Sequence, residues 1–335
     1  MADVARLAGV SPTTVSFVFN ARPDSGIPDA TARRVMRAVE ELGYRPNRQA
    51  SGLRTKRTHT IGFVTDEIAV EPFAGRTISG SHDVAWGSGH LMLIVNTTRN
   101  PRLLRAAIEE LLDRQVDGIV FAVVGTRSAT LPDFVREVPT VMVNCFNPRG
   151  GFPAVLPDES TGGRTATQAL IDAGHRRIAH LTGLPGWATR ERLKGYHAAL
   201  ALAGIVAEPE LVRTGDYHTD SGYELTRALL ALREPPTAIF CGNDRMALGA
   251  YFAANEAGLR IPSDLSIVGY DDQEELASAL RPGLTTVRLP YYELGSWAMQ
   301  RVLAGDVSML PARTYLPCPL VPRDSVAAPA RLTKR

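Results

Sequence analysis

Side chains suited to reading DNA bases gather on one predicted helix near the start of the chain. They are Ser11, Thr13, Thr14, Ser16, Phe17 and Asn20. Most are short enough to approach base edges when a helix carries them into a major groove. Any Ala-rich pair of helices has a similar pattern, so the motif alone leaves an ordinary structural helix as an equal alternative.

Two short helices separated at Gly9 would position these side chains. Gly9 permits the positive φ that a tight turn between helices needs. Ser11 suits the N-cap of the second helix, and Pro12 suits its first position because no N–H is lost there. A small apolar seam is expected between the helices, formed by Ala5, Leu7, Ala8, Val10 and Val15.

A third helix is predicted over 28–42, ended by Gly43 and followed by a basic tether. Its apolar positions are Val35, Ala38, Val39 and Leu42. Residues 1–57 hold 10 Lys and Arg against 5 Asp and Glu, whereas the rest of the chain holds 27 against 30. This asymmetry favours binding of a polyanion by the basic head. The tether residues expected to contact phosphates are Arg45, Arg48, Arg54, Lys56 and Arg57.

The remaining chain alternates predicted strands and helices. Buried strands are predicted over 60–64, 91–95, 118–124, 140–143, 177–181, 237–241 and 265–269. Amphipathic helices are predicted over 74–88, 102–115, 160–173, 190–203, 219–232, 244–257 and 291–303. This rhythm implies parallel sheets covered by helices on both faces, an α/β fold.

Ordered sequence blocks resemble the lactose-repressor (LacI/GalR) family of bacterial transcription regulators. The first blocks are DVARLAGVSPTTVSFVFN, ELGYRPNRQASGLR and IGFV. The later blocks are GHRRIAHLTG, RERLKGYHAAL, TAIFCGNDRMALGA, DLSIVGYDD and LTTVRLP. The similarity extends to about Pro322, and blocks in a common order are far more specific than one motif.

The resemblance implies a domain plan for the whole chain. A helix-turn-helix DNA-binding domain would occupy 1–46, a hinge helix and linker 47–58, an effector-binding core 59–325 and a tail 326–335. The core would be periplasmic-binding-protein-like, with two doubly wound parallel-sheet lobes. Lobe 1 would comprise about 59–157 and 287–325, and lobe 2 about 158–286, joined by three crossing segments.

Ligands of doubly wound sheets bind beyond the carboxyl ends of the strands, so a cleft between the lobes is the expected effector site. Taken singly, its candidates are more readily explained as helix caps or surface ion pairs, but the resemblance assigns them to the effector. They are Arg192, Tyr217, Asn243 and Asp271 in lobe 2, with Asp66, Phe73 and Asn144 on the opposite wall. Arginine donors and carboxylate acceptors suit a hydroxyl-rich ligand, so a sugar is the first choice. A purine-like corepressor is the alternative.

The hinge helix implied by the resemblance would order only when two copies pack together on DNA, since seven residues are marginal as a helix alone. Asn47 would cap it, Ala50 would also face the DNA, and Leu53 would wedge into a central base step. The alternative is a flexible linker with an incidental Leu. We expect a homodimer on a pseudopalindromic operator, a repressor released by its effector.

Three departures from the family pattern carry expectations of their own. Phe17 stands where many members have a polar or basic residue, so it can contact a thymine methyl but cannot pair with guanine. Pro28 stands where a capping Ser is common, so the third helix is expected to begin one or two residues later, capped by Asp29. The chain starts at Met1 without the usual cap, so we expect either that the true start lies upstream or that Asp3 serves the first helix electrostatically.

Composition and motifs bound the other function classes. The chain is 44% hydrophobic and 21% charged, as in ordinary soluble globular proteins. No signal peptide, membrane span, metal-ligand spacing or common enzyme motif is found, and isolated Cys145, Cys241 and Cys318 fit a reduced cytosol. We expect a cytoplasmic, nucleoid-associated bacterial protein that is not an enzyme and needs no cofactor. A sugar-binding protein without DNA function is a lesser alternative.

Overall fold

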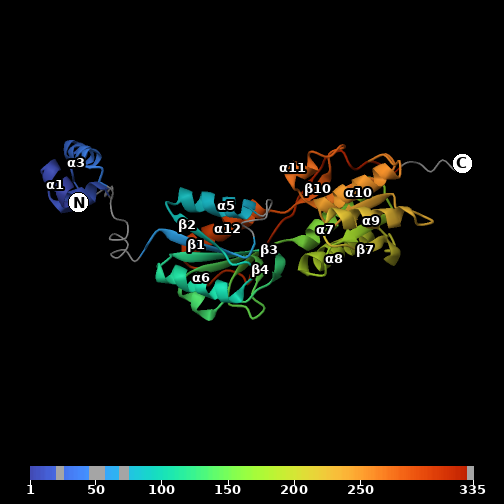
Figure 1. Ribbon diagram of the computed structural model, residues 1–335, viewed down its shortest axis with the longest axis horizontal. Coiled ribbons are helices and arrows are strands. Elements are labelled where there is room, and N and C mark those ends of the chain that lie inside the picture. The colour runs from blue at the N-terminus through green and yellow to red at the C-terminus, as the bar shows by residue number, and fades with distance from the viewer. Residues whose placement is uncertain (20–25, 45–56, 68–74, 330–335) are drawn as a thin grey trace. The chain divides into compact units, whose positions relative to one another are not determined.

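The computed structural model describes residues 1–19, 26–44, 57–67 and 75–329, and the chain forms two compact units, Met1–Thr58 and His59–Arg335 (Figure 1). The first unit contains the helices α1 (Ala2–Ala8), α2 (Pro12–Phe19) and α3 (Asp29–Glu41). Gly9 ends α1 with a φ of 62°, and Ser11 Oγ accepts a hydrogen bond from Thr14 N at 3.1 Å. Both the predicted turn and the predicted cap of α2 are therefore confirmed.

The core of the first unit differs in detail from the predicted seam. Its buried residues are Val4, Ala5, Ala8, Val15, Val35 and Ala38. Leu7 is 48% exposed and Leu42 is 46% exposed, so both predictions were wrong. Leu7 points away from the face shared by Val4 and Ala8. Leu42 lies beyond the last helical residue, where the helical period no longer fixes its direction.

The starts of α1 and α3 carry no side-chain cap. Pro28 occupies the cap position of α3 in an extended conformation, and Asp29 is the first helical residue rather than the predicted cap. Because Pro28 already has extended backbone angles, its carbonyl accepts from Thr31 N and the helix begins directly after it. In α1, Asp3 lies in the first turn, as expected for an electrostatic role, and pairs with Arg6 at 2.9 Å.

The second unit consists of two lobes, each built on a six-stranded sheet (Figure 1). Lobe 1 has the strand order β11-β5-β4-β3-β1-β2. Its elements are β1 (Thr60–Thr65), α5 (Gly75–Gly87), β2 (Leu91–Asn96), α6 (Pro101–Asp113), β3 (Gly118–Ser128), β4 (Thr140–Phe146), β5 (Ala154–Pro157), α12 (Tyr291–Ala304) and β11 (Arg313–Leu316). The helices α5 and α12 pack together on one side of the sheet, while α6 lies on the other.

Lobe 2 repeats this plan with the strand order β12-β10-β9-β8-β6-β7. Its elements are α7 (Glu159–Asp172), β6 (Ile178–Thr182), α8 (Trp187–Leu202), β7 (Val212–Thr214), α9 (Thr219–Leu230), β8 (Ala238–Cys241), α10 (Asp244–Glu256), β9 (Ser266–Asp271), α11 (Glu274–Ala277), β10 (Thr285–Arg288) and β12 (Leu320–Val321). All its strand pairs are parallel except β10 with β12. The pairs α7 with α8 and α9 with α10 cover the sheet.

The predicted strands and helices of the body are all present, and the fold class is confirmed. The sequence missed the short strands β5, β7, β10, β11 and β12, which have two to four residues each and are too short to show a period. The return segment, assigned as a whole to lobe 1, divides: α12 and β11 lie in lobe 1, while β12 pairs with β10 in lobe 2. The tail follows β12, and Ala327 O accepts from Ser266 Oγ at 3.1 Å.

The strand orders define where ligands can bind. In each lobe the chain turns back at one point, between β1 and β3 in lobe 1 and between β6 and β8 in lobe 2. Doubly wound sheets bind ligands at these switch points, beyond the carboxyl ends of the strands. Among the helices of the described residues, none combines the length and apolar character needed to cross a membrane.

Candidate functional site

Arg192 is the centre of a buried charged cluster at the carboxyl end of the lobe 2 sheet. It lies in the second turn of α8 and is 5% exposed. Its Nε donates to Glu159 Oε2 at 2.7 Å and its Nη2 to Glu159 Oε1 at 3.1 Å. Its Nη1 donates to Gly242 O at 2.5 Å, directly after β8. The guanidinium thus ties the start of α7 to the end of β8.

Asp271 completes the cluster from the end of β9. Its Oδ1 lies 3.7 Å from Arg192 Nη2, and Gln273 Nε2 donates to its Oδ2 at 3.4 Å. Burial raises the pKa of Asp271 to about 6, and the positive charge of Arg192 opposes part of this rise. The guanidinium also lies over the ring of Tyr270, 3.7 Å from its centroid. A donor fork and a carboxylate acceptor therefore stand side by side.

Backbone strain marks the same region. Asn144, Tyr217 and Asp271 have φ values of 57°, 70° and 104°, and Asp272 follows with 52°. L-residues rarely adopt positive φ, and such conformations persist where the surrounding structure enforces them, often at binding sites. Three of the candidate effector residues share this feature, which is independent of their side-chain chemistry.

Tyr217 follows β7 and lies against Gly183, which follows β6. A Cβ on Gly183 would lie 1.9 Å from the Tyr217 ring, so only glycine leaves room for it. The phenol oxygen forms a hydrogen bond with Thr189 Oγ1 at 2.7 Å, and burial raises the pKa of Tyr217. One face of the ring is thus occupied by the β6 switch-point loop.

Asn243 acts as the N-cap of α10. Its Oδ1 accepts from Met246 N at 2.9 Å, and its Nδ2 donates to Tyr217 O at 3.0 Å. The geometry matches the helix-cap alternative that the sequence left open. The same amide also holds the strained backbone of Tyr217, so Asn243 supports the site through its neighbour.

Two buried acids in this region were missed by sequence reasoning. Glu159 is the first residue of α7, and Asp244 is the first of α10. Asp244 accepts from Thr286 Oγ1 at 2.6 Å and from Gln273 N at 2.7 Å. Burial, and then the charge of Asp271, raise the pKa of Asp244 well above its ordinary value. Each acid begins a helix shortly after a strand ends, and Glu159 was overlooked because its partner Arg192 lies 33 residues further along the chain.

The opposite wall belongs to lobe 1. Asp66, directly after β1, accepts from Glu67 N at 2.6 Å and from Val124 N at 3.1 Å. Its other oxygen pairs with Arg127 and lies 3.6 Å from Arg99 Nε. These contacts all lie within lobe 1, in β3 and in the loops that follow β1 and β2.

Asn144 is likewise engaged within lobe 1. Its Nδ2 donates to Val123 O at 3.1 Å, and its Oδ1 accepts from Thr126 Oγ1 at 2.5 Å. Both contacts tie the end of β4 to β3, next to the register shift between Ala122 and Arg127. Phe73, the third candidate on this wall, lies outside the described residues.

The lobes also touch through side chains on either side of the cleft. The rings of Phe146 and Trp187 lie 4.9 Å apart, and the guanidinium of Arg313 covers Phe146 at 3.8 Å. Elsewhere Arg76 Nη2 lies 2.7 Å from Glu274 Oε2. A hollow of about 720 Å³ opens beside this second contact, and Asp271 is among its lining residues.

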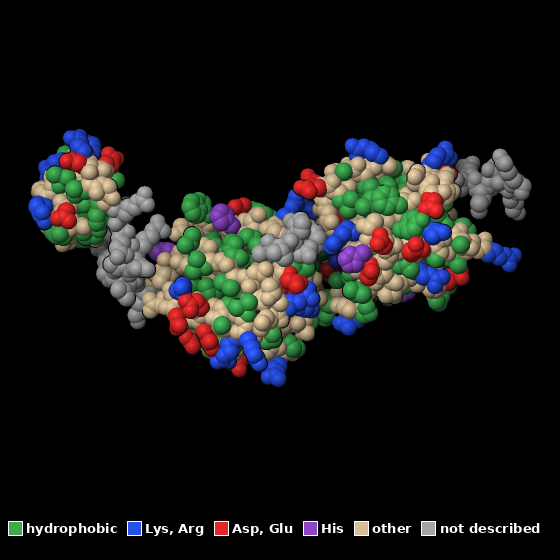
Figure 2. Space-filling view, viewed as in Figure 1, with side chains coloured by type: hydrophobic (Ala, Val, Ile, Leu, Met, Phe, Trp, Pro, Cys, Tyr) green, Lys and Arg blue, Asp and Glu red, His purple; other side chains and the backbone are tan. Residues whose placement is uncertain are grey.

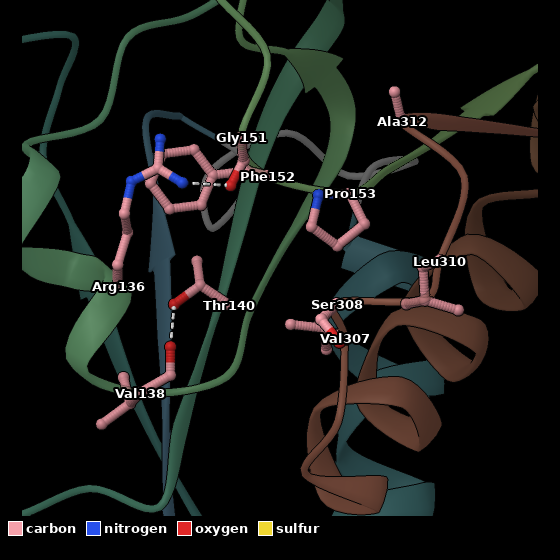
Figure 3. Close-up of a pocket in the computed structure, with 10 residues that line it drawn as sticks. All are labelled: Arg136, Val138, Thr140, Gly151, Phe152, Pro153, Val307, Ser308, Leu310 and Ala312. Atoms are coloured by element: carbon pink, nitrogen blue, oxygen red, sulfur yellow. Dashed lines mark hydrogen bonds between the residues drawn. The ribbon is translucent and has the colours of Figure 1, made fainter.

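A second cavity lies at the opposite end of the lobe 1 sheet. It holds about 370 Å³ and is bordered by Thr140 at the start of β4 and by the loop that follows α12 (Figure 3). Arg136 donates to Gly151 O at 2.6 Å there and lies over the ring of Phe152 (Figure 3). Because it borders the amino ends of the strands, this cavity is separate from the candidate effector site at their carboxyl ends.

In the first unit, α2 carries the predicted DNA-reading residues. Thr13 is exposed, while Thr14, Ser16 and Phe17 are half-buried. Ser11 is committed to capping α2, since its Oγ accepts from Thr14 N. Arg57 is described and exposed. The other predicted DNA contacts lie outside the described residues: Asn20, Arg45, Asn47, Arg48, Ala50, Leu53, Arg54 and Lys56.

Comparison with known proteins gives the family. Residues 1–47 match the model of bacterial regulatory proteins of the lacI family, and residues 167–326 match a periplasmic binding protein-like domain. The ribose operon repressor of Escherichia coli (strain K12) is 38% identical over 89% of this chain and 90% of its own length. The chain belongs to the LacI family. Its predicted class, a DNA-binding transcriptional regulator controlled by a small effector, is thereby confirmed.

Two further family members bear on the effector question. The transcriptional repressor PurR of Erwinia tasmaniensis is 35% identical over 90% of this chain and 88% of its own length. A lac repressor dimer, solved with operator and the anti-inducer ONPF, has a TM-score of 0.77 at 30% identity, covering 97% of this chain and 98% of that one. The repressors of the family that resemble this chain thus include one named for the ribose operon and one named PurR.

Proposed function

We propose that this LacI-family regulator is a repressor that binds a pseudopalindromic operator as a homodimer and releases it when a neutral sugar enters the cleft between its lobes. The observation that carries the proposal is the ion pair between the Arg192 guanidinium and the Asp271 carboxylate, where the strained backbone ends β9 in lobe 2. We place the protein in the bacterial cytoplasm, at the nucleoid, and assign it no enzymatic turnover.

A sugar suits this pair better than a nucleobase. The Asp271 carboxylate can accept from two vicinal hydroxyls, and the remaining guanidinium N–H groups can donate to hydroxyl oxygens. A purine-like corepressor would instead stack on Tyr217 and donate ring N–H groups to Asp271. Tyr217 already has one side against Gly183, which favours the sugar.

The DNA-binding side of the proposal rests on α2 and on the hinge. Thr13 lies exposed on α2, and Phe17 would contact a thymine methyl in the major groove. Leu53, outside the described residues, would insert between central base pairs. Replacing Leu53 by Ala should then weaken operator binding far more than binding to random DNA.

The dimer would form through apolar surface on both lobes. Trp86 on α5 is 69% exposed, Leu91 and Ile94 lie exposed on the edge strand β2, and Phe252 on α10 is 54% exposed. Figure 2 shows hydrophobic side chains gathered over α10 on the visible face of lobe 2. A second copy covering these faces would remove a hydrophobic edge strand from water.

Control by the effector requires two arrangements of the lobes with different DNA affinity. Effector contacts in one arrangement would change the spacing of the two tethers that begin near His59. To move operator occupancy from nearly full to nearly empty, the effector must prefer one arrangement by roughly 5 kcal/mol. Three crossing segments and the few contacts between the lobes leave such a motion available.

Selection of bound DNA from a random pool tests the proposal directly. The intact protein should enrich an inverted repeat, and a panel of free sugars should release it where purine bases do not. Asp271→Asn should keep the enriched sequence and lose the release. Enrichment that needs a purine base would favour the corepressor alternative, and no enriched sequence under any condition would refute DNA regulation.

A further inference from the structure

Glu159 belongs to the buried charged cluster, although the helix that it begins does not need it as a cap. It is the first residue of α7, directly after the chain crosses from β5 into lobe 2, and it is 3% exposed. The preceding Asp158 already caps α7, since its Oδ1 accepts from Thr161 N at 3.0 Å. Glu159 therefore does not cap the helix, and both oxygens of its carboxylate accept hydrogen bonds from Arg192.

The helices that carry the pair are locked together. A Cβ on Gly163 would lie 2.3 Å from Arg192 O, and a Cβ on Gly195 would lie 2.1 Å from Ser160 O. The backbones of α7 and α8 are thus in direct contact at the level of the ion pair. These contacts fix the backbones that carry the pair, and both side chains are buried, so moving the Glu159 carboxylate off Arg192 would leave two buried charges without their partner, which is strongly unfavourable.

The charge around the guanidinium is negative in sum. Glu159 binds two of its nitrogens, Asp271 lies 3.7 Å from one of them, and Gly242 O accepts from the third. One arginine therefore faces two carboxylates and a carbonyl. A phosphate or carboxylate ligand normally binds such a fork through two parallel hydrogen bonds, which here already belong to Glu159.

We propose that Glu159 is a specificity-determining residue of the effector site: it occupies the anion-binding fork of Arg192 and so limits the effector to neutral, hydroxyl-rich molecules, excluding phosphorylated sugars. This inference rests on the proposed sugar-responsive function. Neutral hydroxyls can still accept from the one N–H that Nη1 and Nη2 each have left, and can donate to Asp271. An anion would meet two fixed carboxylates in a site that little water reaches to screen them.

Glu159→Gln tests this inference because it keeps the shape of the side chain and removes its charge. Binding is measured by titration calorimetry with D-ribose, D-ribose 5-phosphate and inorganic phosphate. Wild type should bind neither phosphate compound below millimolar concentration. The variant should bind both phosphate compounds at least tenfold more tightly than wild type, while its affinity for ribose falls or stays unchanged.

Glu191→Gln is the matched control. Glu191 neighbours Arg192 in sequence, but it pairs with exposed Lys194 at 3.6 Å and takes no part in the cluster. The Glu191→Gln substitution also removes one negative charge close to Arg192. It should leave the affinities for ribose, ribose 5-phosphate and phosphate unchanged. An equal gain of phosphate binding in both variants would assign the effect to net charge and overturn the proposal.

The wild-type measurements keep the inference testable if Glu159→Gln fails to fold. Phosphate or a phosphate ester bound in the cleft of the wild-type protein at micromolar concentration would overturn it outright. That outcome would leave the regulator function standing if the ester also released operator DNA. Conversely, an operator response to none of the sugars would refute the proposed function, while the phosphate titrations would still report on Glu159.

Discussion

The two walls of the cleft use the same charged groups in opposite order. In lobe 1 a carboxylate, Asp66, lies between two arginines, Arg127 and Arg99. In lobe 2 an arginine, Arg192, lies between two carboxylates, Glu159 and Asp271. The lobe 1 cluster lies at the end of the switch-point strand β1, whereas the lobe 2 cluster joins the ends of β8 and β9.

The two clusters differ in how much hydrogen-bonding capacity their groups keep for a ligand. Asp66 accepts hydrogen bonds from two backbone N–H groups of its own lobe and also pairs with Arg127. Its carboxylate therefore stabilises the structure of lobe 1. Arg127 and Arg99 are partly open to solvent, with 34% and 54% of their side chains exposed. Arg192 is buried, and its neighbour Asp271 keeps hydrogen-bonding capacity toward the cleft. Under the proposed function, ligand contacts therefore belong chiefly to lobe 2, and the charged cluster of lobe 1 supports its own lobe.

Removing the two arginines in turn should give the largest contrast. Arg192→Met leaves Glu159 and Asp271 buried without their partner, which should cost about 3–5 kcal/mol of unfolding free energy. Arg127→Met leaves Asp66 its backbone N–H groups and Arg99, and because Arg127 is partly exposed its loss should cost about 1 kcal/mol or less. Urea unfolding of both variants measures the difference.

Equal losses from the two substitutions would break the comparison, since they would mean that the lobe 1 cluster is as tightly bound to its arginine as the lobe 2 cluster. Lys194→Met serves as a surface control. It breaks a pair with Glu191 on α8, the helix that also carries Arg192, and should change stability by no more than a few tenths of a kcal/mol.

The pH dependence of stability should separate Asp271 from the rest of the protein. Its pKa is about 6 in the folded chain and 3.8 ordinarily, so the folded state holds the proton more tightly. Its contribution to stability is therefore fully present below pH 3.8 and is lost as the pH rises through 6. The loss should be on the order of 2–3 kcal/mol. The Asp271→Asn variant should not lose this stability, because an amide has no proton to release in this pH range.

The measurement is the difference in unfolding free energy between wild type and Asp271→Asn at a series of pH values from 4 to 7.5. Taking the difference cancels His180, whose pKa burial lowers to about 4 and whose contribution has the opposite slope. The measured difference includes the response of Asp244, because the charge of Asp271 raises its pKa. Wild type should lose stability relative to the variant as the pH rises. A flat difference would show that the carboxylate is fully balanced by Arg192.

Much of the fold could be predicted because long elements carry a period. The helix from 244 and the strand from 118 were predicted within a few residues of their ends. β5 and β10, with four residues each, show no period, and their place in the sheets is set by neighbours distant in the sequence. For the same reason the division of the return segment at β12 could not be predicted from local pattern.

The candidate site was predictable only in part. Arg192 and Asp271 were selected from the family resemblance, and the structure brings them within 3.7 Å of each other. Glu159 escaped notice because its importance comes from a contact with α8, 33 residues further along the chain. The commitment of Asn243 to a helix cap was an alternative already visible in the sequence, since it directly precedes a predicted helix.

A smaller contrast involves two glycines at the switch points, Gly183 in lobe 2 and Gly125 in lobe 1. Gly183→Ala places a Cβ 1.9 Å from the Tyr217 ring, which must move, at a cost of about 1–3 kcal/mol. Gly125→Ala meets no atom within 4 Å but holds a φ of 69°, which costs about 1 kcal/mol.

Thermal unfolding should therefore give overlapping losses of stability for the two variants, whereas the affinity for sugar should fall only for Gly183→Ala. Equal sugar affinity in the two variants would mean that the position of Tyr217 does not matter to the ligand, and that the lobe 2 wall reduces to Arg192 and Asp271.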